Sequence, residues 1–303
     1  MALFVNVFAP VLLPLILVAG AAFLLGRFNR VNPSPIANVT FYLFNPSLVF
    51  VALAHSTVSL EMLGRLVLLK LLVYLALIPV ARAFAVQLKL PASVASAFTL
   101  VVISANSGNF GLSVNEYAFG AAGLALAVIC YVTDNLLINS VGVYLAARGR
   151  ASARGALIQV FRNPAVYAAP LGIVANQLGW NPPLPLERAL EMLSRAAVPT
   201  MLVVLGLQLA VLPLERRHWK LIGLAAALRL IAAPLLALAL AAPLGLTGLA
   251  RQVGVVEVAP PTAVMASIIA GRYDAEPNLV AGTIMFTSLV SLVTVTLLLS
   301  WIS

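Results

Sequence analysis

Charged side chains are scarce in this sequence. Asp, Glu, Lys and Arg make up 9% of the 303 residues, whereas hydrophobic residues make up 62%. An ordinary soluble domain has about 25% charged residues. The composition therefore excludes such a domain and predicts an all-α polytopic membrane protein.

Residues that commonly form disulfides, metal sites or catalytic centres are also few. Cys130 is the only cysteine, which excludes an internal disulfide and a cysteine metal site, and we expect a small core residue there. His55 and His218 show no HExxH spacing, and no glycine-rich phosphate loop with its lysine is present. We therefore expect no enzyme, no metal centre, no cofactor and no ATP-driven pump.

Ten apolar runs are candidates to cross a bilayer. They cover residues 7–26, 36–54, 66–84, 93–114, 119–147, 164–178, 190–212, 219–241, 252–270 and 279–301. The first has no basic residue before it, so we expect a retained helix rather than a signal peptide. Asn45-Pro46-Ser47 is expected to break the second run. Lys70, near one end of the third, is expected to extend its ammonium to the interface.

Helix-breaking residues repeat at a nearly constant separation. Pro10 and Pro164, Pro46 and Pro199, and Asn109 and Pro261 lie 154, 153 and 152 positions apart. This pattern predicts two five-helix repeats, residues 1–147 and 164–303, joined by a cytoplasmic loop at 148–163. Because five is odd, the second repeat would be inverted.

The 18 basic residues exceed the 9 acidic ones by 18 − 9 = 9. Odd-numbered connections between the runs carry twelve of the Lys and Arg residues, and even-numbered ones carry three, Arg65, Arg188 and Arg251. Since basic residues favour the cytoplasmic side, both termini should lie outside the cytoplasm, in a cell (inner) membrane protein surrounded by lipid. The excess gives no reason to expect a nucleic-acid partner.

A polar stretch, SANSGNFGLSV at residues 104–114, interrupts the fourth run. Its Asn, Ser and Gly residues weaken or compete with the backbone bonding that a helix in lipid needs. Transporters use such breaks because the freed helix N-termini, with partial positive charge, can face an anion. The alternative is a packing seam of small residues between helices.

The ninth run contains a second break, EVAPPTA at residues 257–263. Pro260 and Pro261 remove two backbone donors, so the helix must open there. Glu257, inside the apolar run, is a functional candidate, with a structural ion pair or a protonated core acid as the alternative. Asp134 and Arg229 are the other deep charges, and they could pair with each other or with backbone.

Three stretches, NPSLVF at 45–50, SANSGNFGL at 104–112 and EVAPPTAV at 257–264, resemble motifs of the auxin efflux carrier family. Its bacterial members include malate and malonate permeases. The resemblance implies the fold of bile acid sodium symporters, with broken fourth and ninth helices crossing near Gly108, Asn109, Pro260 and Pro261. The sequence departs from the family at Ser113, where proline is common, and it lacks the long loop of the plant carriers, so auxin is not the expected substrate.

These observations together favour a secondary active transporter that moves a small organic anion, such as a carboxylate, by ion-coupled alternating access. The expected substrate-binding residues are Asn106, Ser107, Asn109, Pro261 and Thr262. Glu257, with Asp134 as the second candidate, would bind the coupling ion, Na⁺ or H⁺, in a symport. An anion channel or a membrane sensor on the same fold remains the alternative, and a homodimer is an open expectation.

Overall fold

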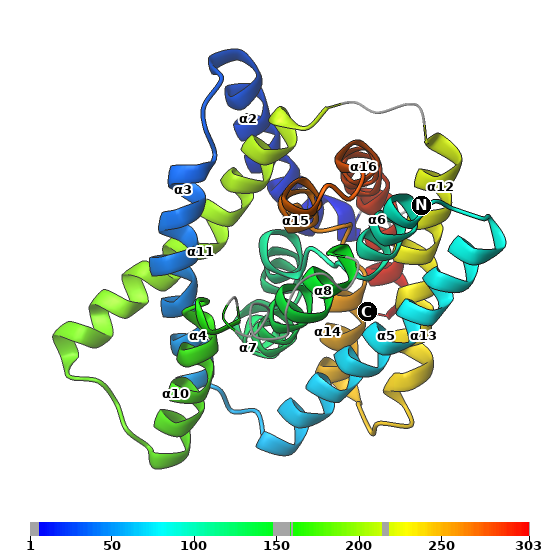
Figure 1. Ribbon diagram of the computed structural model, residues 1–303. Helices are drawn as coiled ribbons and strands as arrows, with labels where there is room; N and C mark the ends of the chain where they lie inside the picture. Colours follow the sequence, from blue (N-terminus) through cyan, green and yellow to red (C-terminus); the bar gives the residue numbers. More distant parts are fainter. Residues whose placement is uncertain (1–5, 148–157, 159, 214–217, 303) are drawn as a thin grey trace.

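The computed structural model describes residues 6–147, 158, 160–213 and 218–302. Within these residues every regular element is a helix, in agreement with the predicted class (Figure 1). Most of the predicted loop at 148–163, including Arg148, Arg150 and Arg154, lies outside the described residues.

In the part of the chain that the structure describes, seven stretches of helix are long and apolar enough to cross a membrane. They comprise η1 (Phe8–Leu12) with α2 (Leu13–Asn29); α3 (Ser34–Val39), η2 (Thr40–Phe44) and α4 (Asn45–Ala54); α5 (Leu60–Gln87); η3 (Ser107–Leu112), α7 (Ser113–Leu137), η4 (Ile138–Gly142) and α8 (Val143–Ala146); α11 (Leu184–Val211); α12 (Trp219–Ala227), η5 (Leu228–Ala232) and α13 (Ala233–Ala241); and α16 (Pro277–Ile302). Four shorter helices are α6 (Ala92–Ile103), α10 (Ala165–Leu178), α14 (Gly248–Val258) and α15 (Met265–Tyr273).

The 40-residue stretch from Ser107 to Ala146 is two helices joined at Gly120. Gly120 has φ 65° and ψ −159°, a conformation that is open almost only to glycine. The chain reverses there, so the part before Gly120 belongs to the fourth predicted run and the part after it to the fifth. The predicted boundary near residue 119 is confirmed.

The second run is not broken at Asn45-Pro46-Ser47, so that expectation is wrong. The helix continues from Ser34 to Ala54, and the π turn η2 directly precedes Asn45. A proline ring clashes with the carbonyl of the preceding turn of an α-helix. The wider π turn gives the ring of Pro46 room, so the helix continues through it.

The helices form two groups that pack mainly within themselves. We call α2, α3, α4, α10 and α11, with η1, η2 and Asn163 just before α10, the outer bundle. The inner bundle consists of α5 to α8 and α12 to α16, with η3, η4, η5 and the two breaks. The outer bundle lies on the left in Figure 1 and the inner bundle at the centre and right. Close approach of α2 and α11 depends on small residues, since a Cβ at Gly26 would lie 2.9 Å from the Cβ of Ala210. The bundles meet where α7 and η3 contact α4, α10 and α11.

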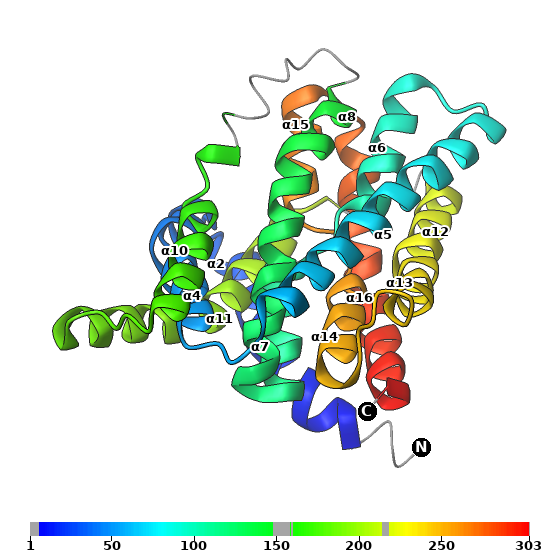
Figure 2. The same ribbon diagram turned by 90° about the horizontal axis from the view of Figure 1, so that it is seen from below.

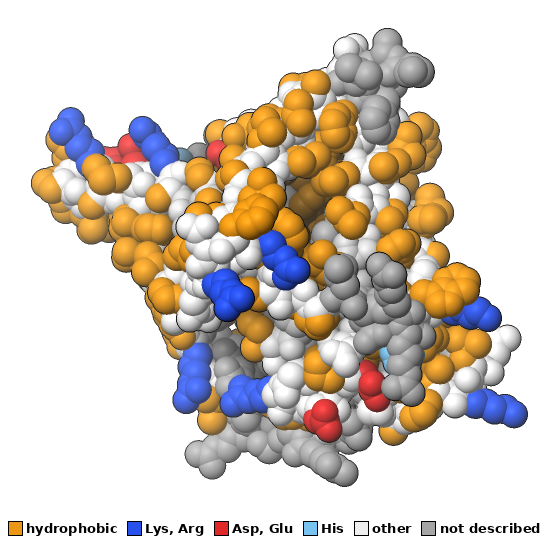
Figure 3. Space-filling model, turned by 90° about the horizontal axis from the view of Figure 1, so that it is seen from above, with side chains coloured by type: hydrophobic (Ala, Val, Ile, Leu, Met, Phe, Trp, Pro, Cys, Tyr) orange, Lys and Arg blue, Asp and Glu red, His pale blue; other side chains and the backbone are white. Residues whose placement is uncertain are grey.

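The N-terminal helix η1 and the end of α16 lie at one end of the molecule, whereas α8 and α15 reach the opposite end (Figure 2). Large apolar side chains are exposed on the long helices, among them Leu17, Leu75 and Leu289. Apolar side chains also cover much of the face in Figure 3, where Lys and Arg gather in a few groups. Such a surface suits lipid. Cys130 is buried in the core, as expected.

Candidate functional site

The two breaks lie side by side, although more than 150 residues separate them in the sequence. Ala105 and Thr262 form an isolated antiparallel bridge. The Asn106 N–H donates to the Pro261 carbonyl at 2.8 Å, and the Ala263 N–H donates to the Ser104 carbonyl at 2.9 Å. Each break thus satisfies backbone groups of the other, which is what non-helical backbone requires at membrane depth.

Four helix ends converge on this bridge. Helices α6 and α14 end there with their carbonyl groups, at Ile103 and Val258, and helices η3 and α15 begin there with their N–H groups, at Ser107 and Met265. The buried Arg229 of η5 donates to the Val102 carbonyl at 3.2 Å and also to the Val258 carbonyl. A fixed cation therefore compensates the negative ends of α6 and α14. Of the roles expected for Arg229, the structure supports bonding to backbone.

A cavity of about 130 Å³ lies at the junction of the two bundles. The inner bundle lines it with the polar residues Asn106, Ser107, Asn109 and Asp134, and the outer bundle contributes Gln208 of α11. The first turns of η3 and α15 also line it, so two helix N-termini face the same space. Three of the five predicted substrate-binding residues thus come together here.

Among the described residues, the cavity lining does not include Pro261, Thr262 or Glu257. Pro261 and Thr262 instead lie outside the cavity lining, where their hydrogen bonds hold the two breaks together. The Thr262 hydroxyl donates to the Val101 carbonyl at 3.0 Å, and its N–H donates to the Thr287 hydroxyl at 3.1 Å.

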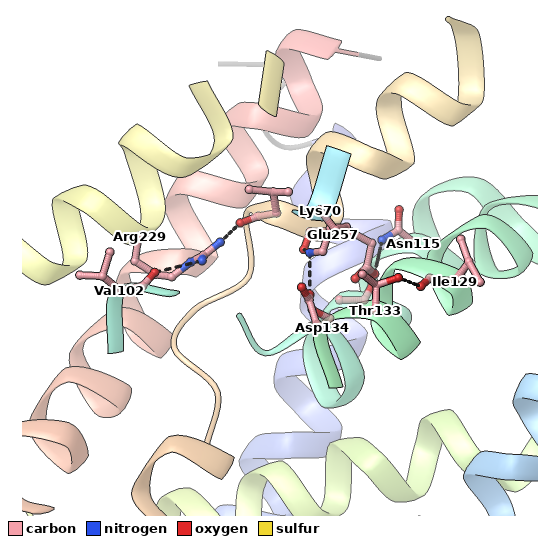
Figure 4. Close-up of polar contacts among 11 residues, drawn as sticks. Lys70, Val102, Asn115, Ile129, Thr133, Asp134, Arg229 and Glu257 are labelled. Carbon is pink, nitrogen blue, oxygen red and sulfur yellow. Dashed lines mark hydrogen bonds and ion pairs between the residues drawn. The ribbon is translucent and has the colours of Figure 1, made fainter. Parts of the chain in front are cut away.

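Lys70 does not extend to the interface, so that expectation is wrong. It is 3% exposed, and its Nζ lies 2.6 Å from Oδ2 of Asp134 and donates to the Glu257 carbonyl at 2.8 Å (Figure 4). The helix α5 starts at Leu60, earlier than the apolar run suggested, and this places Lys70 well inside the helix. A buried ammonium is tolerated because a carboxylate and an opened helix end bind it together.

Asp134 connects the ion pair to the cavity. Its Oδ2 accepts from Lys70 and from the hydroxyl of Ser107. Its side chain remains 13% exposed, and it lines the cavity. The Ser107 hydroxyl therefore bonds Asp134, rather than being free for a ligand.

Glu257 is fully buried, at 0% exposure. Its Oε1 accepts from Nδ2 of Asn115 at 2.9 Å, whereas Oε2 has no partner among the described residues. A Cβ at Gly111 would lie 2.7 Å from Oε1, so the carboxylate fits only beside glycine. In the described part of the chain, no three of His, Cys, Asp and Glu gather as metal ligands.

Neutral side chains connect the bundles. Asn45 on α4 and Asn135 on α7 both donate to the hydroxyl of Tyr131, the second at 3.1 Å. Nδ2 of Asn163 donates to Oδ1 of Asn135 at 2.8 Å. Sequence reasoning did not identify Tyr131, Asn115 or Gln208. The one available signal was an amide or hydroxyl group within an otherwise apolar helix.

Comparisons with known proteins agree on the class of protein. The sequence model of the family described as Membrane transport protein matches residues 148–299. An "Uncharacterized transporter" of Methanocaldococcus jannaschii is 26% identical over 295 residues, which is 95% of each chain. A "Putative malonate transporter" of Rhizobium meliloti is 28% identical over 202 residues, 64% of this chain and 63% of that protein. "Probable auxin efflux carrier component 1b" of Oryza sativa subsp. japonica is 27% identical over 139 residues, 44% of this chain and 25% of that protein.

Proposed function

Because this chain belongs to the Membrane transport protein family, the family of the auxin efflux carriers, we propose that it is a secondary active transporter of a small organic anion. The observation that carries the proposal is the cavity between the bundles, where two helix N-termini and the amides of Asn106 and Asn109 face one small space. A relative named as a malonate transporter supports a carboxylate as the substrate.

The chemistry of the lining suits an anion that must also be released. Helix N-termini and amide groups donate hydrogen bonds to a carboxylate but carry no full positive charge. Lys70 and Arg229 lie close by, but Asp134 and backbone carbonyls already bind their charged groups. The substrate would therefore bind through partial charges and leave without separating from a fixed cation.

The proposed architecture has ten membrane helices in two inverted repeats, with the broken fourth and ninth helices crossing at the bridge between Ala105 and Thr262. Five crossings, an odd number, would put the start and the end of the first repeat on opposite sides of the membrane. In support of this, η1 lies at one end of the molecule and α8 at the other (Figure 2). In this proposal the inner bundle moves against the outer one and exposes the cavity to each side in turn, with both termini outside the cytoplasm.

We propose Glu257 as the coupling residue. The space between Asp134 and the Glu257 carbonyl already holds the ammonium of Lys70, which leaves Asp134 less suited to bind a sodium ion. A fully buried carboxylate with one unpartnered oxygen is costly as a bare charge, so Glu257 would carry a proton or a cation. In this proposal the organic anion is taken up in symport with that proton or cation.

The test is uptake of labelled malonate into proteoliposomes under a pH gradient in sodium-free buffer, and under a sodium gradient at fixed pH. Accumulation above the external concentration supports a carrier and identifies the ion. Flux that only dissipates a gradient would indicate a channel, and the absence of any small-acid flux or binding would overturn the proposal. Glu257→Gln should fold, because it mimics the neutral acid, and should lose gradient-driven accumulation.

A further inference from the structure

Two buried amide atoms in the cavity have no partner among the described residues. One is Nδ2 of Asn106, a residue that is 5% exposed and lies at the start of the helix that begins with η3. The other is Oε1 of Gln208 on α11. Both residues line the same cavity, one from each bundle. Buried polar atoms are nearly always paired, so a donor and an acceptor left open in one cavity are positions where a molecule in the cavity, water or ligand, would form hydrogen bonds.

The cavity also contains a carboxylate whose charge is balanced by the ammonium of Lys70. Asp134 lines it, and both of its described contacts, from Lys70 and from the Ser107 hydroxyl, are made to Oδ2. The acceptors Asp134 and Gln208 thus share the cavity with the donor Asn106 and the two helix N-termini. A second carboxylate on a ligand would face these two acceptors with no free cation to pair with, because Asp134 and a backbone carbonyl already bind Lys70, whereas a hydrogen-bond donor would be satisfied there.

We propose, on the premise of the transport function above, that Gln208 is a specificity residue. It accepts a hydrogen bond from a second polar group of the ligand while the carboxylate of the ligand binds Asn106. With Asp134 beside it, Gln208 restricts the substrate to a small acid that carries one negative charge and one hydrogen-bond donor. Malonate would then bind as the hydrogen malonate ion rather than as the doubly charged form.

The size of the cavity and the position of Gln208 add to this inference. A cavity of about 130 Å³ is smaller than the roughly 300 Å³ at which pockets for drug-sized ligands begin, so only a few heavy atoms fit. Gln208 belongs to the outer bundle, so it contacts the ligand only while the bundles are arranged as in this structure. Gln208 would therefore distinguish between substrates at the junction of the two bundles.

Three probes of nearly equal size separate charge from hydrogen bonding. Malonamate carries one charge and an amide donor, monomethyl malonate carries one charge and no donor at its ester, and malonate at high pH carries two charges. Binding to the purified full chain would be measured by calorimetry and by thermal shift. At a pH where malonate is doubly ionised, malonamate should bind roughly tenfold more tightly than either other probe. Malonate should gain affinity as the pH falls and hydrogen malonate forms, whereas malonamate should change less.

Gln208→Leu should remove the preference for malonamate over monomethyl malonate without weakening monomethyl malonate. Gln208→Met, which keeps the side chain long and unbranched, is the second variant if Gln208→Leu does not fold. Gln177→Leu changes an exposed glutamine of α10 outside the cavity and should keep the preference.

Doubly ionised malonate that binds as well as malonamate, or variants of Gln208 that retain the preference, would overturn the inference and leave the transport proposal standing. If none of the three probes binds while another small carboxylate is transported, the inference alone fails, and if no small carboxylate binds or is transported, the proposed function itself fails.

Discussion

Replacing Lys70 by Met should destabilise the protein strongly, and the structure indicates by how much. The substitution removes the ammonium that lies 2.6 Å from Asp134 and 2.8 Å from the Glu257 carbonyl. Removing one partner of a buried ion pair typically costs about 3 to 5 kcal/mol. Asp134 keeps its bond from Ser107 and 13% of its side-chain exposure, which places the expected loss near the lower end, about 3 kcal/mol. At about 2 to 4 °C per kcal/mol, the midpoint of thermal unfolding should fall by roughly 6 to 12 °C.

A double-mutant cycle separates the ion pair from the loss of packing. The single variant Asp134→Asn removes the negative charge and leaves the ammonium of Lys70 without its ionic partner. The double variant, Lys70→Met with Asp134→Asn, removes both charges, so no unpaired charge stays buried. The double variant should be more stable than the sum of the single losses predicts, by roughly 2 kcal/mol, when thermal unfolding is followed by circular dichroism in detergent. Single losses that simply add, or a loss below about 1 kcal/mol for Lys70→Met, would refute the assignment of a buried ion pair.

Three further predictions concern residues at the two breaks, and a fourth concerns the topology expected from the basic residues. Arg229→Met leaves two buried carbonyls without this donor and should cost about 3 kcal/mol in thermal unfolding, whereas a change within error would mean that other groups satisfy these carbonyls. Gly111→Ala places a methyl group 2.7 Å from Oε1 of Glu257, so it should lower the free energy of unfolding by about 1 to 3 kcal/mol and impair coupled uptake. The control is Gly20→Ala, where the added methyl group meets nothing within 4 Å. Asn109→Ala should weaken anion binding by roughly five- to a hundred-fold in calorimetry, and unchanged binding would exclude a direct contact. In a Cys130→Ala background, cysteines at positions 152 and 303, which lie outside the described residues, should be labelled from the cytoplasm and from outside respectively, and the opposite pattern would reverse the predicted topology.

The breaks could be predicted from the sequence because their cause is local. Consecutive prolines at 260 and 261 and the cluster of Asn, Ser and Gly residues at 104–111 oppose the helix through their own backbone and side chains. The structure places both interruptions within the predicted stretches. Pro46 misled because a proline next to a π turn can be accommodated without a break.

The polar contacts of the site could not be predicted because each joins elements that are distant in sequence. Lys70 bonds residues 64 and 187 positions away, and the bond from Asn115 to Glu257 spans 142 positions. Gln208 lies nine residues after Pro199 on a helix of the outer bundle that is continuous and was not among the stretches that resemble the family. Only the packing of the two bundles shows that its amide faces the cavity.

The distribution of charge between the bundles favours movement at their junction. The ion pair of Lys70 and Asp134 lies within the inner bundle, and Arg229 bonds carbonyls of the same bundle. In the described part of the chain, the ion pairs of less than 4 Å join residues of one bundle and never of both. The polar contacts between the bundles, such as that of Asn45 with Tyr131 and that of Asn163 with Asn135, are neutral. A neutral hydrogen bond contributes about 1 kcal/mol net, whereas separating a buried ion pair costs about 3 to 5 kcal/mol. If transport moves one bundle past the other, as proposed, the movement would break only weak contacts, and the charges beside the cavity would move together as one unit.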